Sequence, residues 1–172
     1  MRGSSILKTM LLILLGIMLV VAILFAVAAA RGGDKDLGTA ADFSAVSAAG
    51  GQFTLSEQYA RGGVVLMFYD RSTSNGVTLL TNAAAAVSGT DVTTVLVSAG
   101  ETDEKELLNY LSENSLSADV IIADTDGEIA ALYNVTSCPV TYFINAEGSV
   151  RAVSLSNLTP SAAKKYVGYI NK

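Results

Sequence analysis

The stretch that decides the fold of this chain runs from Ala130 to Gly148, AALYNVTSCPVTYFINAEG. It holds the only cysteine of the chain, Cys138, directly followed by one of its two prolines, Pro139. The largely apolar residues 140–145 and the segment 149–155 flank a short turn that ends at Gly148. Two strand-like runs joined by a glycine-containing turn predict a β-hairpin that begins immediately after the proline.

Upstream of this hairpin, apolar runs alternate with helical patterns. Residues 64–69, VVLMFY, form an uninterrupted apolar run typical of a buried strand. Residues 104–114 carry acids in the first turn and leucines at helical spacing, which predicts an amphipathic helix. The other predicted elements are an extended piece at 52–55, a helical turn at 56–60, helices at 77–87, 126–133 and 159–170, and strands at 91–98 and 120–123. This order predicts an α/β domain with a mixed central sheet and helices on both faces.

The N-terminal part carries a long apolar segment. Residues 10–30 are an uncharged run of 21 residues, long enough to cross a hydrocarbon core of about 30 Å as a helix. After a short tail at 1–9, we expect a transmembrane anchor in a single-pass protein of the cell membrane, with the domain outside the cytoplasm. The alternative is a signal peptide, because basic residues precede the run and alanines end it; cleavage would then give a secreted protein. The Gly-, Ala- and Ser-rich residues 31–51 predict a flexible linker to a domain at 52–172.

Charge and residue types exclude several classes of function. The chain has a net charge of −5, and since Arg2, Lys8 and Arg31 are its only charged residues up to position 31, the remainder has a net charge of −8. Such an acidic domain argues against nucleic acid or an anionic lipid surface as a partner. The chain has no histidine, the commonest general base and metal ligand. Residues 124–128 resemble half of a calcium-binding loop, but the ligands of the other half are missing. We therefore expect no metal and no cofactor.

Two segments of the chain resemble a known family: FTLSEQYARGGVVLMFY at residues 53–69, and IIADTDGEIAALYNVTSCPVTYFINAEGSV at residues 121–150. They are similar to the membrane-anchored thioredoxin-like proteins of the TlpA/ResA and redoxin (AhpC/TSA) group, whose pattern includes G-K-x-V-x-x-x-F-W and P-T-x-F-x-I-D-x-x-G. The likeness spans residues 52–172 and implies a bacterial protein with a thioredoxin-like fold. It also implies that Pro139 follows a cis peptide bond, which leaves the backbone of Cys138 free to pair with an extended substrate.

The chain departs from this family where the reactive cysteines belong. If Phe68-Tyr69 stands at the family's Phe-Trp, the two cysteines of Cys-x-x-Cys fall on Thr73 and Gly76. In a peroxiredoxin alignment the peroxidatic cysteine falls near Val77. Dithiol exchange needs a second thiol to resolve the mixed disulfide, and this chain has one cysteine. We therefore expect a degenerate active site.

The predicted binding groove consists of Ser72, Thr73, Ser74, Cys138 and Pro139. Free N–H groups at the start of the helix after the loop would hold an anion or a carboxylate there. The alternative is that the three hydroxyl residues only cap that helix and form the turn. Cys138 is either a reactive thiol that faces the groove or a small, half-buried apolar residue on a strand.

Three functions fit these residues. The first is a binding or accessory module that holds a protein partner in the extracytoplasmic space without redox chemistry. The second is a one-cysteine thiol oxidoreductase or peroxidase, with Cys138 as the catalytic residue and an outside thiol as resolver. The third is a disulfide-linked dimer through Cys138, which would make the thiol structural. The state of this thiol discriminates among the three.

Overall fold

The computed structural model describes residues 36–72, 76–100 and 103–171. Its elements follow the order that the sequence predicts, with one additional strand near the start. They are β1 (Ser44–Val46), β2 (Gln52–Thr54), α2 (Leu55–Gly62), β3 (Val64–Tyr69), α3 (Gly76–Val87), β4 (Thr93–Ala99), α4 (Glu104–Glu113), β5 (Val120–Asp124), α5 (Glu128–Leu132), β6 (Val140–Ile144), β7 (Val150–Ser154) and α6 (Pro160–Ile170). The helix α5 begins two residues later than expected because Gly127, with φ of 72°, forms a turn in the left-handed region.

A five-stranded mixed sheet in the order β5-β4-β3-β6-β7 forms the centre of the domain. All six residues of β3 are buried, as expected of a strand covered on both faces. β3, β4 and β5 run parallel, while β6 pairs antiparallel with β3 and β7 antiparallel with β6. The predicted hairpin at the end of the domain is therefore confirmed, and it supplies one edge of the sheet.

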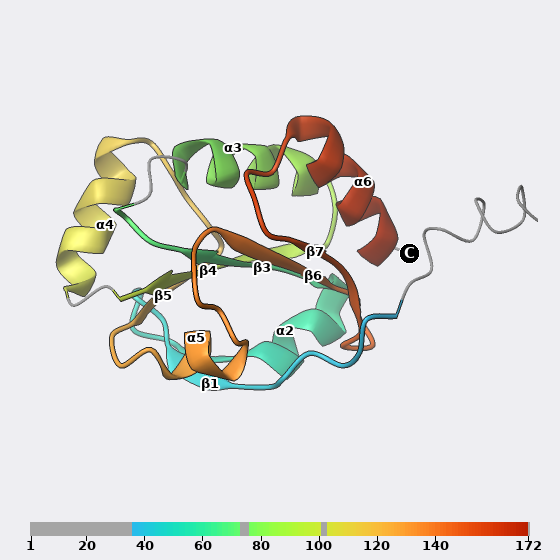
Figure 1. The fold of residues 1–172 in the computed structure, drawn as a ribbon, viewed down its shortest axis with the longest axis horizontal. Helices are drawn as coiled ribbons and strands as arrows, with labels where there is room; N and C mark the ends of the chain where they lie inside the picture. Colours follow the sequence, from blue (N-terminus) through green and yellow to red (C-terminus); the bar gives the residue numbers. More distant parts are fainter. Residues whose placement is uncertain (1–35, 73–75, 101–102, 172) are drawn as a thin grey trace, which may run out of the picture. The chain divides into compact units, whose positions relative to one another are not determined.

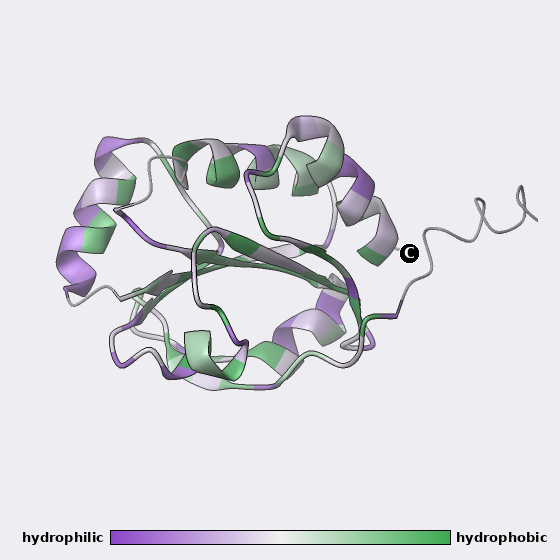
Figure 2. Cartoon of the chain, viewed as in Figure 1, coloured by the Kyte–Doolittle hydropathy of each residue, from purple (hydrophilic) through white to green (hydrophobic). Residues whose placement is uncertain are grey.

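Two layers cover this sheet, with α3, α4 and α6 on one face and α2, α5 and β1 on the other (Figure 1). Successive side chains of β3 point to opposite faces of the sheet, so the strand contributes to the core under both layers. Val65, Met67 and Tyr69 contribute to the core under the first group of helices, and Leu66 and Phe68 to the core on the opposite face. Apolar residues accordingly concentrate along the sheet and on the inward sides of the helices (Figure 2). The expected α/β class is confirmed.

Residues 36–51 correct the prediction of a flexible linker over 31–51, because they belong to the domain. Ala40 is buried, and its N–H donates to the carbonyl oxygen of Gly148 at 2.8 Å. β1 pairs antiparallel with β2, and Phe43 packs its ring against Phe53 with centroids 5.7 Å apart. The small residues of this segment resemble a linker in composition, yet the few apolar ones among them are enough to hold it on the sheet.

The expected membrane anchor at 10–30 lies outside the described residues, as do residues 31–35. Within residues 36–72, 76–100 and 103–171, no helix combines the length and the apolar character that crossing a membrane requires.

Candidate functional site

The register of two strands brings Ser72 and the Cys138-Pro139 pair to the same end of the sheet. Phe68 near the end of β3 pairs with Val140 at the start of β6. The loop after β3 and the Cys138-Pro139 pair therefore lie at the same end of neighbouring strands. The Cys138–Pro139 peptide bond is cis, in agreement with the resemblance. Both residues are partly exposed, so a ligand can reach them.

Of the three hydroxyl residues predicted for the groove, only Ser72 is described. It is exposed, and its N–H donates to Asp70 Oδ1 at 2.8 Å, the geometry of an Asx turn. This bond agrees with the turn-forming alternative for Ser72. Thr73 and Ser74 lie outside the described residues, and a role for them in binding stays a prediction.

The Cys138 thiol lies in surroundings that disfavour its ionised form. It is half-buried against the apolar core below the sheet. This burial raises the pKa of the Cys138 thiol, and the carboxylate of Asp70 raises the pKa further. A protonated thiol is a poor nucleophile. The surroundings of Cys138 are thus the reverse of those that activate a catalytic cysteine.

We expect alkylation of Cys138 by iodoacetamide to follow a pH curve displaced above that of a free cysteine, whose pKa is about 8.5. The Asp70→Asn substitution should move the curve to lower pH, because it removes a negative charge and keeps the oxygen that accepts from Ser72. Asp91→Asn, an exposed position at the opposite end of the sheet, is the matched control. Mass spectrometry of the full chain at a series of pH values measures both curves. Rapid alkylation near pH 7, about 1.5 units below that free-cysteine value, would contradict a raised pKa of the Cys138 thiol.

Tyr69 occupies the space beside the position where the resemblance puts the second cysteine. That position is Gly76, the first residue of α3. A Cβ atom at Gly76 would overlap the ring of Tyr69. The ring itself is fully buried and stacks on Tyr110 with centroids 6.4 Å apart and planes at 20°. A cysteine side chain does not fit at residue 76 unless this buried ring moves.

A pair of tyrosines holds the loop that carries Cys138. The Tyr142 hydroxyl donates to the carbonyl oxygen of Tyr133 at 2.9 Å and so closes the loop between them. The Tyr133 hydroxyl donates to the carbonyl oxygen of Ala41 at 2.7 Å. Burial raises the pKa of Tyr133, and the neighbouring Tyr142 adds to this rise. Both hydroxyls remain protonated at physiological pH, so these two hydrogen bonds hold the loop.

A small pocket of about 240 Å³ opens on this proline loop. It is lined by Asn134, Val135, Thr136, Ser137, Val140, Tyr142 and Leu155. Leu155, just after β7, leaves 76% of its surface exposed, and Val77 in the first turn of α3 leaves 39%. Exposed apolar side chains at this end of the sheet suit contact with a protein segment.

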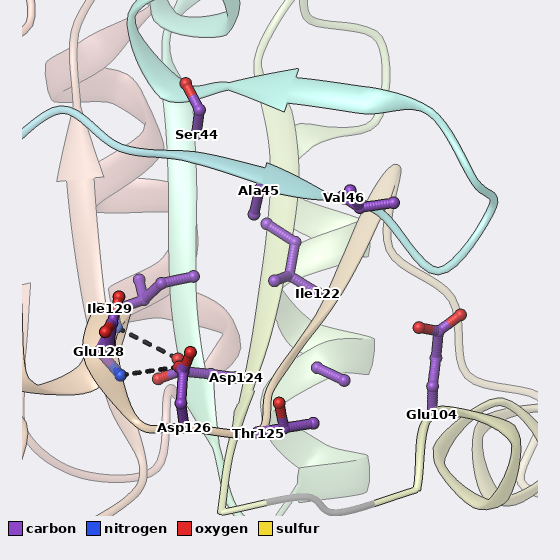
Figure 3. Close-up of a pocket in the computed structure, with 11 residues that line it drawn as sticks. Ser44, Ala45, Val46, Glu104, Ile122, Asp124, Thr125, Asp126, Glu128 and Ile129 are labelled. Atoms are coloured by element: carbon purple, nitrogen blue, oxygen red, sulfur yellow. Dashed lines mark hydrogen bonds between the residues drawn. The ribbon is translucent and has the colours of Figure 1, made fainter.

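The turn that resembles half of a calcium loop has a structural use. Asp124 is buried, and its two carboxylate oxygens accept from the N–H groups of Ile129 at 3.1 Å and Ala130 at 2.8 Å. Asp126 accepts from the N–H of Glu128 at 3.1 Å. Figure 3 shows these side chains at the start of α5. The carboxylates therefore cap the short helix and fix the chain that leads to the proline loop.

Sequence reasoning missed three residues of this region: Tyr69, Asp70 and Leu155. Tyr69 appears in the sequence as one more apolar residue of the strand, and only the fold brings its ring to Gly76. The effect of Asp70 on Cys138 depends on the pairing of β3 with β6. Leu155 completes the apolar pattern of the hairpin, and a signal for its exposure was the polar pair Ser156-Asn157 that follows it.

Comparison with known proteins agrees with the fold described above. The profile of the AhpC/TSA family matches residues 37–153. No curated protein matches the chain. A solved structure of a secreted disulfide oxidoreductase from Mycobacterium tuberculosis, homologous to E. coli DsbE, is 23% identical with a TM-score of 0.62, over 73% of this chain and 94% of that one.

Two further solved structures are similar to the chain. StoA from Bacillus subtilis is 18% identical with a TM-score of 0.61, over 73% of this chain and 96% of that one. The exposed lipoprotein thioredoxin Etrx1 from Streptococcus pneumoniae is 25% identical with a TM-score of 0.59, over 74% and 98%. The described domain has a thioredoxin-like fold, and the chain belongs to the AhpC/TSA family.

Proposed function

We propose that this protein is a membrane-anchored, redox-inactive binding module that holds a protein partner in the groove beside Cys138 and Pro139. One observation carries the proposal: the Tyr69 ring fills the space that a side chain at Gly76 would need. The site has thus lost the second cysteine and also the room for it. A domain that kept dithiol chemistry would require that room.

The remaining geometry supports a binding role. The proline loop is held in place by the Tyr142 and Tyr133 hydroxyls, so the loop itself is preformed and little ordering of it is needed on binding. Leu155 and Val77 offer exposed apolar contacts. The similar structures from Mycobacterium tuberculosis and Streptococcus pneumoniae are described as a disulfide oxidoreductase and a thioredoxin. We take from them the fold alone, and propose that this chain uses the surface beside Cys138 and Pro139 for binding without redox chemistry.

A photo-crosslinking amino acid at Leu155 tests this proposal in intact cells. We expect the Leu155 probe to capture one defined protein, and a probe at Leu37, which is exposed but lies by β7 away from the proline loop, to capture none. The Val77→Asp substitution should reduce the Leu155 crosslink several-fold, because it places a charge among the apolar contacts. Equal capture from both positions, or a crosslink indifferent to Val77→Asp, would show that this groove is not the binding surface.

The alternative function, a one-cysteine oxidoreductase or peroxidase using Cys138, makes a different prediction. We expect the full chain to reduce neither insulin nor a hydroperoxide faster than its Cys138→Ser variant. The physical reason is the raised pKa of the Cys138 thiol, which keeps it protonated near neutral pH. Turnover that disappears in the Cys138→Ser variant would establish the enzyme instead and remove the redox-inactive proposal.

We also propose that residues 10–30 anchor the protein with its domain outside the cytoplasm. The support is the uncharged apolar run of 21 residues with basic residues before it. Carbonate-washed membranes should retain the intact protein, and protease added to spheroplasts should digest the domain. Recovery of a soluble form that begins near Arg31 would show a cleaved signal peptide.

A further inference from the structure

A second surface of the domain lies along β5, the outermost strand of the sheet on the side away from the hairpin. Two pockets follow each other along this strand. The first, of about 340 Å³, is lined by residues of β1, by Ile122 to Asp126 and by Glu104, Glu128 and Ile129. The second, of about 350 Å³, is lined by Ser47 to Ala49, Ala118 to Ile121 and Leu108. We call the two together the β5 groove.

The walls of the β5 groove come from two different elements. Glu104 and Leu108 are one helical turn apart and present the same side of α4 to it. The opposite wall is the segment from Ser44 to Ala49, which includes Val46 with 62% of its surface exposed. Figure 3 shows β1 on one side of β5 and Glu104 on the other. The edge of β5 therefore forms the floor between a helix and a short strand.

The floor of the groove offers unused backbone hydrogen-bonding groups. The Ala48 N–H donates to the carbonyl oxygen of Ile121 at 2.8 Å, so the backbone of Ile121 points away from the sheet. Because alternate residues of a strand point their backbone groups to the same side, the N–H and C=O of Ala123 also point outward. No hydrogen bond from residues 36–72, 76–100 or 103–171 reaches the outward groups of Ala123. An extended segment can pair with a strand edge of this kind.

The negative charge of the β5 groove determines which kind of extended segment it can bind. Glu104, Asp126 and Glu128 are exposed carboxylates on its rim. No lysine or arginine lines either pocket, and no ion pair within the described part of the chain neutralises these three residues. A second copy of this acidic domain would bring like charges together and is disfavoured. An extended segment with lysines or arginines on one face and apolar residues on the other complements both the carboxylates and the exposed Val46.

We propose that the β5 groove docks an extended, basic segment of a partner protein as an added strand. The site is separate from the groove beside Cys138, so each can fail without the other. Its recognition elements are the outward backbone of Ala123, the rim carboxylates, and the apolar side chains of Val46 and Leu108.

The probe is a fluorescent hexapeptide of alternating lysine and valine, and the protein is the full chain in a nonionic detergent. We expect binding by fluorescence anisotropy, and slower hydrogen exchange at residues 120–125. The double substitution Glu104→Gln and Glu128→Gln should weaken binding about fivefold, as expected for the loss of two exposed charge pairs. The control is Glu57→Gln with Glu147→Gln, two exposed carboxylates away from the groove, which should leave the affinity unchanged. Ala123→Pro should abolish binding because it removes an outward N–H, and an edge strand tolerates proline.

Several results would overturn the proposal. Equal binding of a glutamate–valine hexapeptide, or equal effects of the two double substitutions, would show that the rim carboxylates do not select the ligand. Loss of binding in Leu155→Asp would place the peptide in the groove beside Cys138. Self-association of the chain that strengthens in the Glu104→Gln and Glu128→Gln variant would identify a second copy as the occupant.

Discussion

Replacing Gly76 with alanine is expected to lower the free energy of unfolding by about 2–3 kcal/mol, the upper part of the range for an overpacked core. The added Cβ overlaps the ring of Tyr69, which is fully buried and stacked on Tyr110. Urea unfolding of the full chain in detergent, followed by circular dichroism, measures the difference. A cysteine at this position meets the same obstacle, because its Cβ lies where that of alanine lies.

Gly168→Ala is the matched control for this substitution. Gly168 also lies in a helix, α6, and a Cβ there meets nothing within 4 Å. We expect it to raise the free energy of unfolding by up to about 1 kcal/mol, the difference in helix propensity. In a Tyr69→Leu background, the cost of Gly76→Ala should fall below about 1 kcal/mol, because contacting residues are coupled. An unchanged cost in that background would mean that the Tyr69 ring is not the obstacle.

Replacing Asp124 with alanine is expected to lower the free energy of unfolding by about 2–4 kcal/mol. The substitution removes the acceptor of two N–H groups, those of Ile129 and Ala130, in a place where Asp124 itself is only 2% exposed. Donors left unsatisfied away from water cost about 1–3 kcal/mol each at full burial, and somewhat less where one is partly exposed. Urea unfolding again provides the measurement.

Asp126→Ala is the comparison for the Asp124 prediction. Asp126 lies two residues further along, is exposed, and accepts from a single N–H group, that of Glu128. We expect a loss of no more than about 1 kcal/mol, as for an ordinary exposed cap. Similar losses in both variants would indicate that the turn is solvated and that Asp124 does not hold the start of α5.

Much of the fold is predictable from local pattern. The uninterrupted apolar run at 64–69 identifies the central strand, and the paired runs around Gly148 identify the hairpin, because burial on two faces and tight turns each leave a direct mark on composition. β1 left no such mark. Three residues of a Gly-, Ala- and Ser-rich segment suffice for a strand once the ring of Phe43 packs against the ring of Phe53, and that contact forms only in the tertiary structure.

The candidate site also has a part that the sequence predicts and a part that only the structure shows. The sequence alone shows that Thr73 and Gly76 are not cysteines, and the resemblance places Cys138 beside their loop. The pairing of Phe68 with Val140 supports that neighbourhood for the described part of the loop. The Tyr69 ring against Gly76 and the effect of Asp70 on the thiol are contacts between side chains whose geometry depends on the whole sheet, and residue spacing carries no information about them.

The hydrogen bonds from Tyr142 to Tyr133 and from Tyr133 to Ala41 bear on how the protein responds to its environment. A pair of thiols can be oxidised to a disulfide and reduced again. A chain with one cysteine forms no internal disulfide, and here phenolic hydroxyls that do not take part in thiol exchange hold the proline loop. We therefore expect its affinity for the proposed partner to be the same in an oxidising and a reducing medium. Binding would then not respond to changes in the redox poise of the surroundings.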